Sequence, residues 1–88
     1  MEEIYCVYIL YSEAYDRFYV GHTNSIERRI EEHNSGRNKS TSPYLPWRLI
    51  GVIKKPDKSS AVELEFKLKN LSKKRKIEFI NKYVKEDK

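Results

Sequence analysis

The sequence predicts one α+β domain whose elements follow in the order β-β-α-β-α-α. The chain has 88 residues, which is enough for one domain and too few for two, so we treat residues 1–88 as a single unit. Hydrophobic residues make up 39% of the chain, a share that supports a folded core and is too high for a disordered tail. Runs of β-branched and aromatic residues are followed by segments whose apolar residues recur at helical spacing.

Three segments are predicted to be strands. Residues 4–11 are dense in β-branched and aromatic side chains and contain neither glycine nor proline. Residues 17–21 follow after a polar turn of about five residues, a spacing that predicts an antiparallel hairpin. The third strand covers residues 47–54, after a polar loop that contains two prolines.

Three helices are predicted from capping signals and apolar periodicity. Asn24 followed by Glu27 resembles a capping box, as does Ser60 followed by Glu63, and Ser72 can cap the last helix. A glycine at position 36 gives the first helix its C-terminal stop. The predicted helices cover residues 25–35, 60–71 and 73–84.

The composition excludes several classes of protein. A single cysteine, Cys6, excludes an internal disulfide and a zinc site built from several cysteines. No apolar run approaches the ~20 residues of a membrane span, and the acidic start differs from a signal peptide. We therefore expect a cytoplasmic protein that has no membrane partner.

Positive charge is concentrated in the second half of the chain. Residues 1–44 hold 5 Lys and Arg against 7 Asp and Glu, and residues 45–88 hold 13 against 6. Clustered cations bind a polyanion by releasing its condensed counterions, so the basic half favours nucleic acid as a ligand. A solvated helical face accounts for the same charge equally well.

Two charged residues lie at the edges of predicted apolar stripes. Glu65 stands beside Leu64 and Leu68, where a carboxylate is unfavourable unless it is paired or bound to a cation. Lys69, at i+4, can supply that pair. Arg29 flanks the stripe of the first helix, where its stem can cover apolar surface while its guanidinium stays in water.

Together with two tyrosine motifs, these residues form a family pattern. The tripeptides Val7-Tyr8-Ile9 and Tyr19-Val20-Gly21 place their tyrosines 11 residues apart, and Arg29 follows the second tyrosine by ten residues. With His33 and Glu65, the pattern resembles the GIY-YIG nuclease domain over nearly the whole chain. It is most similar to the small stand-alone members of that family.

The resemblance implies a central three-stranded antiparallel sheet flanked by helices, and phosphodiester hydrolysis with one divalent ion, Mg²⁺ or Mn²⁺. By position, Tyr19 would activate the attacking water, Arg29 would stabilise charge on the phosphate, and Glu65 would hold the metal. Tyr8 would shape the site, and His33 would assist proton transfer or position the substrate. We expect Tyr8, Tyr19, Arg29 and Glu65 to converge on one patch.

This chemistry is physically reasonable for these residue types. A phenol is a weak base near neutral pH, but a neighbouring cation favours its phenolate. Arginine offers phosphate oxygens a planar pair of donors that lysine lacks. Gly21, having no side chain, would let the end of its strand approach a phosphate.

Two positions depart from the family pattern. Cys6 stands where the first motif begins with glycine, and His22 follows the second motif where several active members carry lysine. His22 can donate to a phosphate when it is protonated. Both changes bear on the rate of catalysis, and neither affects the predicted fold.

Three functions are compatible with this pattern. The leading one is a metal-dependent endonuclease, acting on DNA more than on RNA, in repair or recombination, with a protein partner that supplies specificity. The second is a non-catalytic nucleic-acid-binding module, and the third is a partner-binding protein kept soluble by its lysines. The expected nucleic-acid contacts are His22, Lys67, Lys69, Lys73, Lys74, Arg75 and Lys76.

Overall fold

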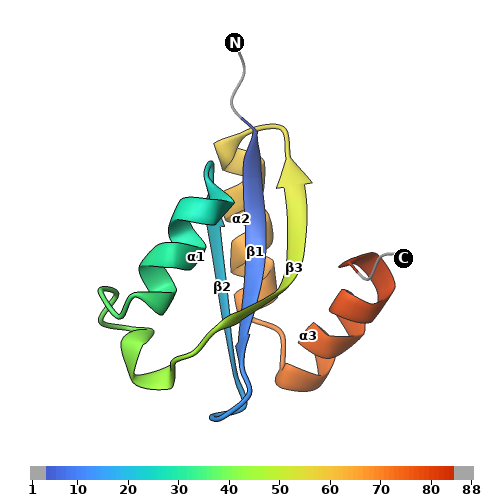
Figure 1. The fold of residues 1–88 in the computed structure, drawn as a ribbon. Helices are drawn as coiled ribbons and strands as arrows, with labels where there is room; N and C mark the ends of the chain where they lie inside the picture. Colours follow the sequence, from blue (N-terminus) through green and yellow to red (C-terminus); the bar gives the residue numbers. More distant parts are fainter. Residues whose placement is uncertain (1–3, 85–88) are drawn as a thin grey trace.

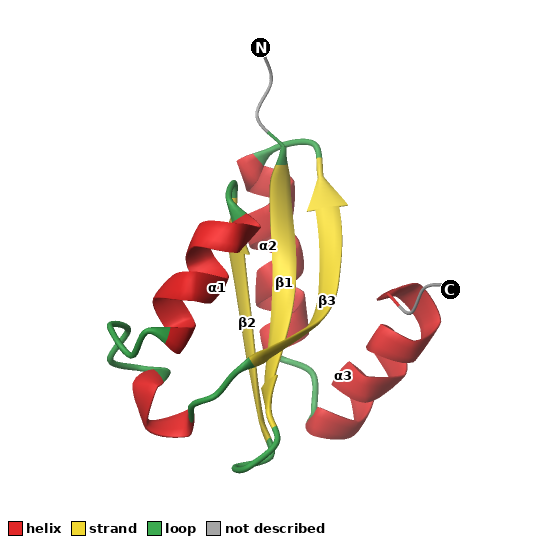
Figure 2. Ribbon diagram, viewed as in Figure 1, coloured by secondary structure: helices red, strands yellow, loops and turns green. Residues whose placement is uncertain are grey.

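The computed structural model describes residues 4–84, which form a three-stranded antiparallel sheet with helices on both faces (Figures 1 and 2). The sheet order is β2-β1-β3, so the first strand lies in the centre. The predicted fold class and element order are confirmed. The elements are β1 (Tyr5–Ser12), β2 (Arg17–Thr23), α1 (Ile26–Asn34), η1 (Ser42–Tyr44), β3 (Arg48–Lys55), α2 (Lys58–Lys69), α3 (Lys73–Phe79) and the π-helical turn η2 (Ile80–Val84).

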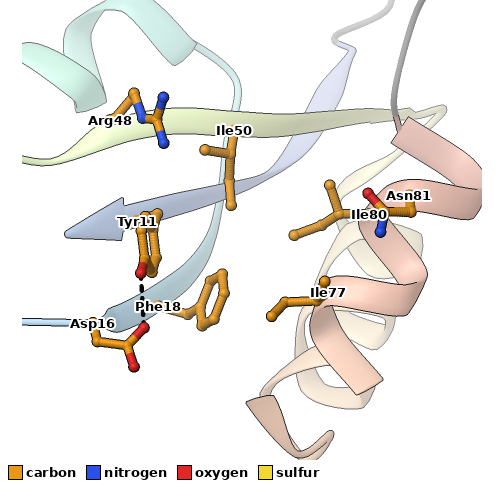
Figure 3. A pocket seen from close by; sticks show the side chains of 8 residues that line it. All are labelled: Tyr11, Asp16, Phe18, Arg48, Ile50, Ile77, Ile80 and Asn81. Carbon is orange, nitrogen blue, oxygen red and sulfur yellow. Dashed lines mark hydrogen bonds between the residues drawn. The ribbon is translucent and has the colours of Figure 1, made fainter. Parts of the chain in front are cut away.

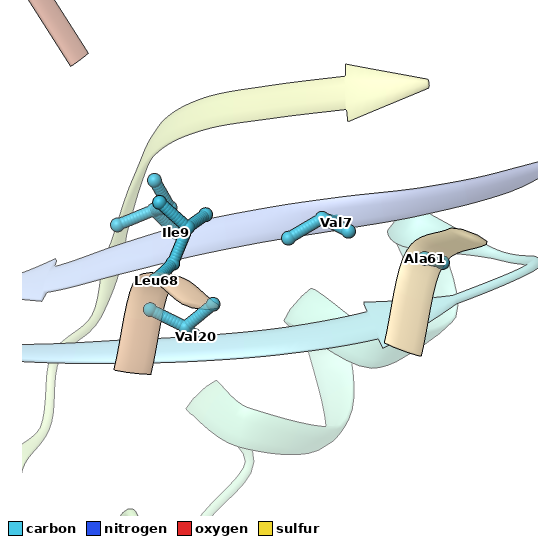
Figure 4. Close-up of a cluster of buried hydrophobic side chains, with 5 residues drawn as sticks. All are labelled: Val7, Ile9, Val20, Ala61 and Leu68. Carbon is cyan, nitrogen blue, oxygen red and sulfur yellow. The ribbon is translucent and has the colours of Figure 1, made fainter. Parts of the chain in front are cut away.

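The central strand β1 is buried on both faces of the sheet. Val7 and Ile9 face α2 and pack with Val20, Ala61 and Leu68 (Figure 4). Successive residues of a strand point to opposite faces, so the intervening side chains face α1. This alternation explains why residues 7–10 are all buried, and why this segment reads as a continuous apolar run in the sequence.

On the opposite face, a second core cluster lies beneath α1. Tyr8 and Leu10 of β1 form it together with Trp47. Ile26 and Ile30 of α1 pack against this cluster, as expected for residues one helical turn apart. The two clusters place α1 on one face of the sheet, and α2 with α3 on the other (Figure 1).

Two of the three predicted helix caps are wrong. Ser25, not Asn24, is the N-cap of α1, and its backbone N–H donates to the hydroxyl of Thr23 at 3.0 Å. Helix α2 begins at Lys58 because the carboxylate of Asp57 accepts a hydrogen bond from the backbone N–H of Ser60. Asp57 is therefore the N-cap of α2, in place of the capping box predicted at Ser60 and Glu63.

The third helix starts as predicted. The hydroxyl of Ser72 accepts a hydrogen bond from the backbone N–H of Arg75 at 3.2 Å and caps α3. No helix in the described part of the chain is long and apolar enough to cross a membrane.

Candidate active site

Tyr8 and Gly21 are cross-strand partners at the centre of the site. The side chain of Tyr8 is fully buried and extends over Gly21. A Cβ atom at position 21 would lie 2.5 Å from the Tyr8 hydroxyl oxygen and 2.7 Å from Cζ, distances too short for any non-bonded contact. The glycine of the second motif is therefore required by the tyrosine of the first.

A buried chain of hydrogen bonds holds Tyr8 in place. Its hydroxyl oxygen lies 3.0 Å from His33 Nε2, and His33 Nδ1 lies 3.0 Å from the Thr41 hydroxyl. The Trp47 indole donates to the Thr41 carbonyl at 2.9 Å. Burial, together with the charge of Arg29, lowers the pKa of His33, so its ring is neutral and makes one bond as a donor and the other as an acceptor. His33 thus orients Tyr8 from inside the protein.

Tyr19, the tyrosine of the second motif, is half-buried on the same face as Tyr8. Its ring centroid lies 4.7 Å from that of His33 and 6.2 Å from that of Tyr8. The register explains this arrangement, because Tyr8 pairs with Gly21 and Leu10 pairs with Tyr19, so both tyrosines project from the α1 face.

Arg29 approaches the tyrosines from α1. Its guanidinium donates to the Glu32 carboxylate at 2.9 Å. Burial and the neighbouring Tyr19 raise the pKa of Tyr8 to about 12, while Arg29 works in the opposite direction. Tyr8 is therefore protonated at neutral pH, which disfavours it as a general base.

Glu65 reaches the same edge of the sheet from α2. Its Oε1 bonds His22 Nδ1, and its Oε2 lies 2.8 Å from Lys69 Nζ. Partial burial alone would raise the pKa of Glu65, but the bonds from Lys69 and His22 outweigh it and lower that pKa. Glu65 is thus ionised at neutral pH, and its predicted pairing with Lys69 is present.

The outer strand β2 carries both Tyr19 and His22, the residue that bonds Glu65. Tyr8 is close enough to Tyr19, Arg29 and Glu65 for each of them to shift its pKa, and Tyr19 in turn raises the pKa of Lys69. The tyrosines and Arg29 belong to the α1 face, whereas Glu65 belongs to the α2 face and reaches the edge beside His22. Because β2 is an edge strand, groups from both faces of the sheet can approach its free side.

A divalent cation at this site would rest on Glu65. Within residues 4–84, no group of three or more His, Cys, Asp or Glu side chains is arranged to hold a metal. Mg²⁺ and Mn²⁺ are nevertheless suited to a single carboxylate, completed by water and substrate phosphate oxygens. The donor set fits such an ion, provided that Lys69 or His22 releases a Glu65 oxygen.

Half of the six helical cations predicted to bind nucleic acid are engaged within the protein. Lys69 pairs with Glu65, Lys73 Nζ lies 2.5 Å from Asp16, and Lys76 donates to the Leu71 carbonyl at 2.7 Å. The other three form no ion pair within the described part of the chain, and they are Lys67, Lys74 and Arg75.

The sequence did not single out the residues that support His33. Thr41 and Trp47 lie in and after the polar loop, and the Asn34 side chain anchors that loop by donating to the Trp47 carbonyl and accepting from its N–H. The sequence signal that pointed to this region was His33. The roles of Thr41 and Trp47 depend on how the loop folds back over α1.

An apolar groove lies apart from these residues, between α3 and the sheet. It encloses about 220 Å³ and is lined by Phe18, Ile50, Ile77 and Ile80, beside the hydrogen bond from Tyr11 to Asp16 (Figure 3). It contains neither the tyrosine pair nor Glu65, so we do not assign the chemistry to it.

Comparisons with known proteins agree with this geometry. The GIY-YIG catalytic domain family matches residues 4–78. A UPF0213 protein from Bacillus cereus is 41% identical over 80 residues, which cover 89% of this chain and 81% of that protein. The solution NMR structure of a UPF0213 protein from Bacillus halodurans superposes with a TM-score of 0.60 at 32% identity, over 92% of this chain and 86% of that one.

A further relative comes from a larger protein. A structure-specific endonuclease subunit SLX1 homolog from Brugia malayi is 30% identical, over 92% of this chain and 27% of that protein. Family membership implies nucleic acid as the ligand. The fold, the two tyrosine motifs and these matches together show that the chain belongs to the GIY-YIG catalytic domain family.

Proposed function

We propose that this protein is a divalent-metal-dependent endonuclease that hydrolyses phosphodiester bonds in DNA. The observation that carries the proposal is that one edge strand, β2, holds Tyr19 beside Tyr8 and also holds His22, which bonds an ionised Glu65. Arg29 lies close enough to shift the pKa of Tyr8. A module that only binds nucleic acid has no need for a half-buried, ionised carboxylate at this strand. The SLX1 homolog, named as a structure-specific endonuclease subunit, adds support from a relative.

Each residue has a defined part in the proposed reaction. The oxygen of a water molecule forms a bond to phosphorus while its proton passes to the Tyr19 oxygen, which accepts it as a phenolate. The bond from phosphorus to the leaving sugar oxygen breaks, and that oxygen keeps the electron pair and takes a proton from solvent water. The guanidinium of Arg29 donates to the non-bridging phosphate oxygens, where negative charge develops. Tyr8, held by His33, fixes the wall against which Tyr19 packs.

Glu65 would hold Mg²⁺ or Mn²⁺, and such an ion would offset the charge that develops on the leaving oxygen. The carboxylate is already ionised and half-buried, so it needs no proton loss before it binds a cation. The proposal includes a role in cytoplasmic DNA repair or recombination. A protein partner would supply specificity, as the word subunit in the name of the SLX1 homolog suggests for that relative.

A substrate survey tests the proposal. Purified protein is incubated with single-stranded, duplex, flap and branched DNA, and with RNA of the same sequences, in Mg²⁺, Mn²⁺ or a chelator. We expect cleavage of at least one DNA substrate that the chelator abolishes. Cleavage that persists in the chelator would contradict metal dependence, and faster cleavage of RNA would reassign the substrate.

One observation favours a non-catalytic binding module as the second candidate. Lys69 and His22 occupy both oxygens of Glu65, and His22 stands at the position that departs from the family pattern. If this arrangement persists when nucleic acid is bound, no cation can reach the carboxylate. Protein that binds DNA but cuts none of the substrates with either metal would favour this candidate.

A further inference from the structure

A cavity of about 190 Å³ lies beside the site, where the end of β2 meets the first turns of α1 and α2. Four of its lining side chains carry or can carry positive charge: His22 from β2, Arg28 and Arg29 from α1, and Lys58 from α2. Asn24 adds an amide to the same wall. Three separate elements thus bring cationic and donor groups to one hollow.

The positive charge of this cavity is only partly neutralised by carboxylates of the protein. Among the described residues, no carboxylate lines it. Arg29 is paired with Glu32, and His22 is bonded to Glu65, but Arg28 and Lys58 take part in no ion pair within residues 4–84. Like charges gathered around a hollow repel one another, so the arrangement favours an anion that enters it.

We propose that this cavity binds a phosphate group of the nucleic acid strand next to the phosphate that is cleaved, an inference that rests on the proposed function. Arg29 and His22 belong both to the cavity and to the candidate active site, so an anion in the cavity lies directly beside the reacting group. Arg28 offers two parallel donors to phosphate oxygens, and Lys58 adds a point charge.

A bound phosphate at this position would set the register of the strand. Phosphate contacts carry no sequence information, but they fix where the backbone lies on the protein. The cavity therefore acts as a positioning site, and it holds the strand so that the neighbouring phosphate faces Tyr19 and Glu65.

The lysines of α3 cannot serve this purpose, because they lie at the other end of β2. Lys73 is paired with Asp16 in the hairpin turn, just before β2 begins at Arg17. Arg17 and His22 are five residue steps apart along the strand, which is about 17 Å at the usual rise. The α3 cations can contact more distant phosphates, and the cavity serves the adjacent one.

Binding of a nucleotide with two phosphates tests the proposal without any cleavage. Thymidine 3′,5′-bisphosphate and thymidine 5′-monophosphate are titrated into the protein and followed by the NMR shifts of backbone amides. The bisphosphate should bind about tenfold more tightly, since a second charge-assisted contact is worth on the order of 1.4 kcal/mol. Its extra shifts should fall at Thr23, Asn24 and Arg28.

Two double variants supply the comparison. Arg28→Ala with Lys58→Ala should reduce the preference for the bisphosphate to less than twofold. Arg37→Ala with Lys39→Ala removes one arginine and one lysine beyond the opposite end of α1, and it should keep the full preference. On single-stranded DNA, only the first pair should lower the slope of log affinity against log salt by about 1.

The single variant Lys58→Gln should give a smaller loss in the same direction, and it serves if the double variant fails to fold. An unchanged preference in the cavity variants, or shifts that map to α3, would overturn the proposal. The titration uses no cleavage, so protein that never cuts but keeps the preference would refute the nuclease and leave the phosphate site standing.

Discussion

Tyr8 and Gly21 are cross-strand partners, and the phenol ring of Tyr8 fills the volume in which a side chain at position 21 would lie. The ring is fully buried, and its hydroxyl is bonded to His33. The two motifs that look separate in the sequence are therefore one packed unit, which sets the position of Tyr19 beside it.

The variant Gly21→Ala should destabilise the protein by about 1–3 kcal/mol, the usual range for an overpacked core. Its methyl group would overlap the Tyr8 ring, which has no free space to enter. Urea unfolding measures the loss. In a Tyr8→Leu background the same change should have little effect, and an equal loss in both backgrounds would disprove the steric explanation.

Stability should also depend on the protonation of His33. Burial and Arg29 lower its pKa in the folded protein, whereas the unfolded chain has the ordinary value of about 6.5. Near and below that pH the unfolded state binds more protons than the folded state. The unfolding free energy should therefore decrease as the pH is lowered, by at most about 1.4 kcal/mol per pH unit.

Unfolding free energies of wild type and His33→Gln, measured between pH 5 and 8, test this linkage. The variant is less stable throughout because it disrupts the bonds to Tyr8 and Thr41, but its curve should be flatter below about 6.5. His22→Gln, a change at the other histidine, should show the same decrease in unfolding free energy at low pH as wild type. A His33→Gln curve parallel to wild type would rule out His33 as the source.

The sequence was sufficient to predict the fold because each strand and helix carries its own local signal. The catalytic candidates were also visible, since Tyr8, Tyr19, Arg29 and Glu65 match a spaced family pattern. Helix starts were harder, because Asp57 and Ser60 both suit an N-cap and only the backbone path decides between them. Where a short polar segment contains several residues that favour the N-cap, their identity alone does not show which of them caps the helix.

Features created by tertiary contact could not be predicted. The support of His33 by Thr41 depends on a loop folding back over α1, and no local pattern marks it. Arg28 and Lys58 are 30 residues apart in the sequence. They line the same cavity only because β2 and β3 end at the same end of the sheet. Charge counted over halves of the chain also obscured Arg28 and Arg29, which belong to the acidic half.

The ion pair between Glu65 and Lys69 should weaken the binding of divalent metal. Lys69 Nζ holds one carboxylate oxygen, so a cation must displace it before it can bind. Lys69→Met should therefore bind Mn²⁺ more tightly than wild type, by up to about fivefold, since a partly exposed pair contributes up to about 1 kcal/mol. Electron paramagnetic resonance of free Mn²⁺ measures the affinity without nucleic acid.

Lys67→Met is the matched control, because it removes the same charge from the same helix but lacks an ion pair within the described part of the chain. It should leave Mn²⁺ affinity close to wild type. Equal effects of the two variants would mean that general charge governs metal binding, and no effect of Lys69→Met would exclude competition at Glu65.

The most direct test compares cleavage and binding in Tyr19→Phe and Glu65→Gln. The first removes only a hydroxyl, and the second keeps the side-chain shape while removing the charge that a metal requires. Both proteins should lose metal-dependent cleavage of the best DNA substrate by at least about a hundredfold, the scale of a lost acid–base group, yet bind that DNA within about twofold of wild type. Cleavage retained in either variant, or lost only in step with DNA affinity, would contradict the assignment of Tyr19 and Glu65 as the catalytic pair.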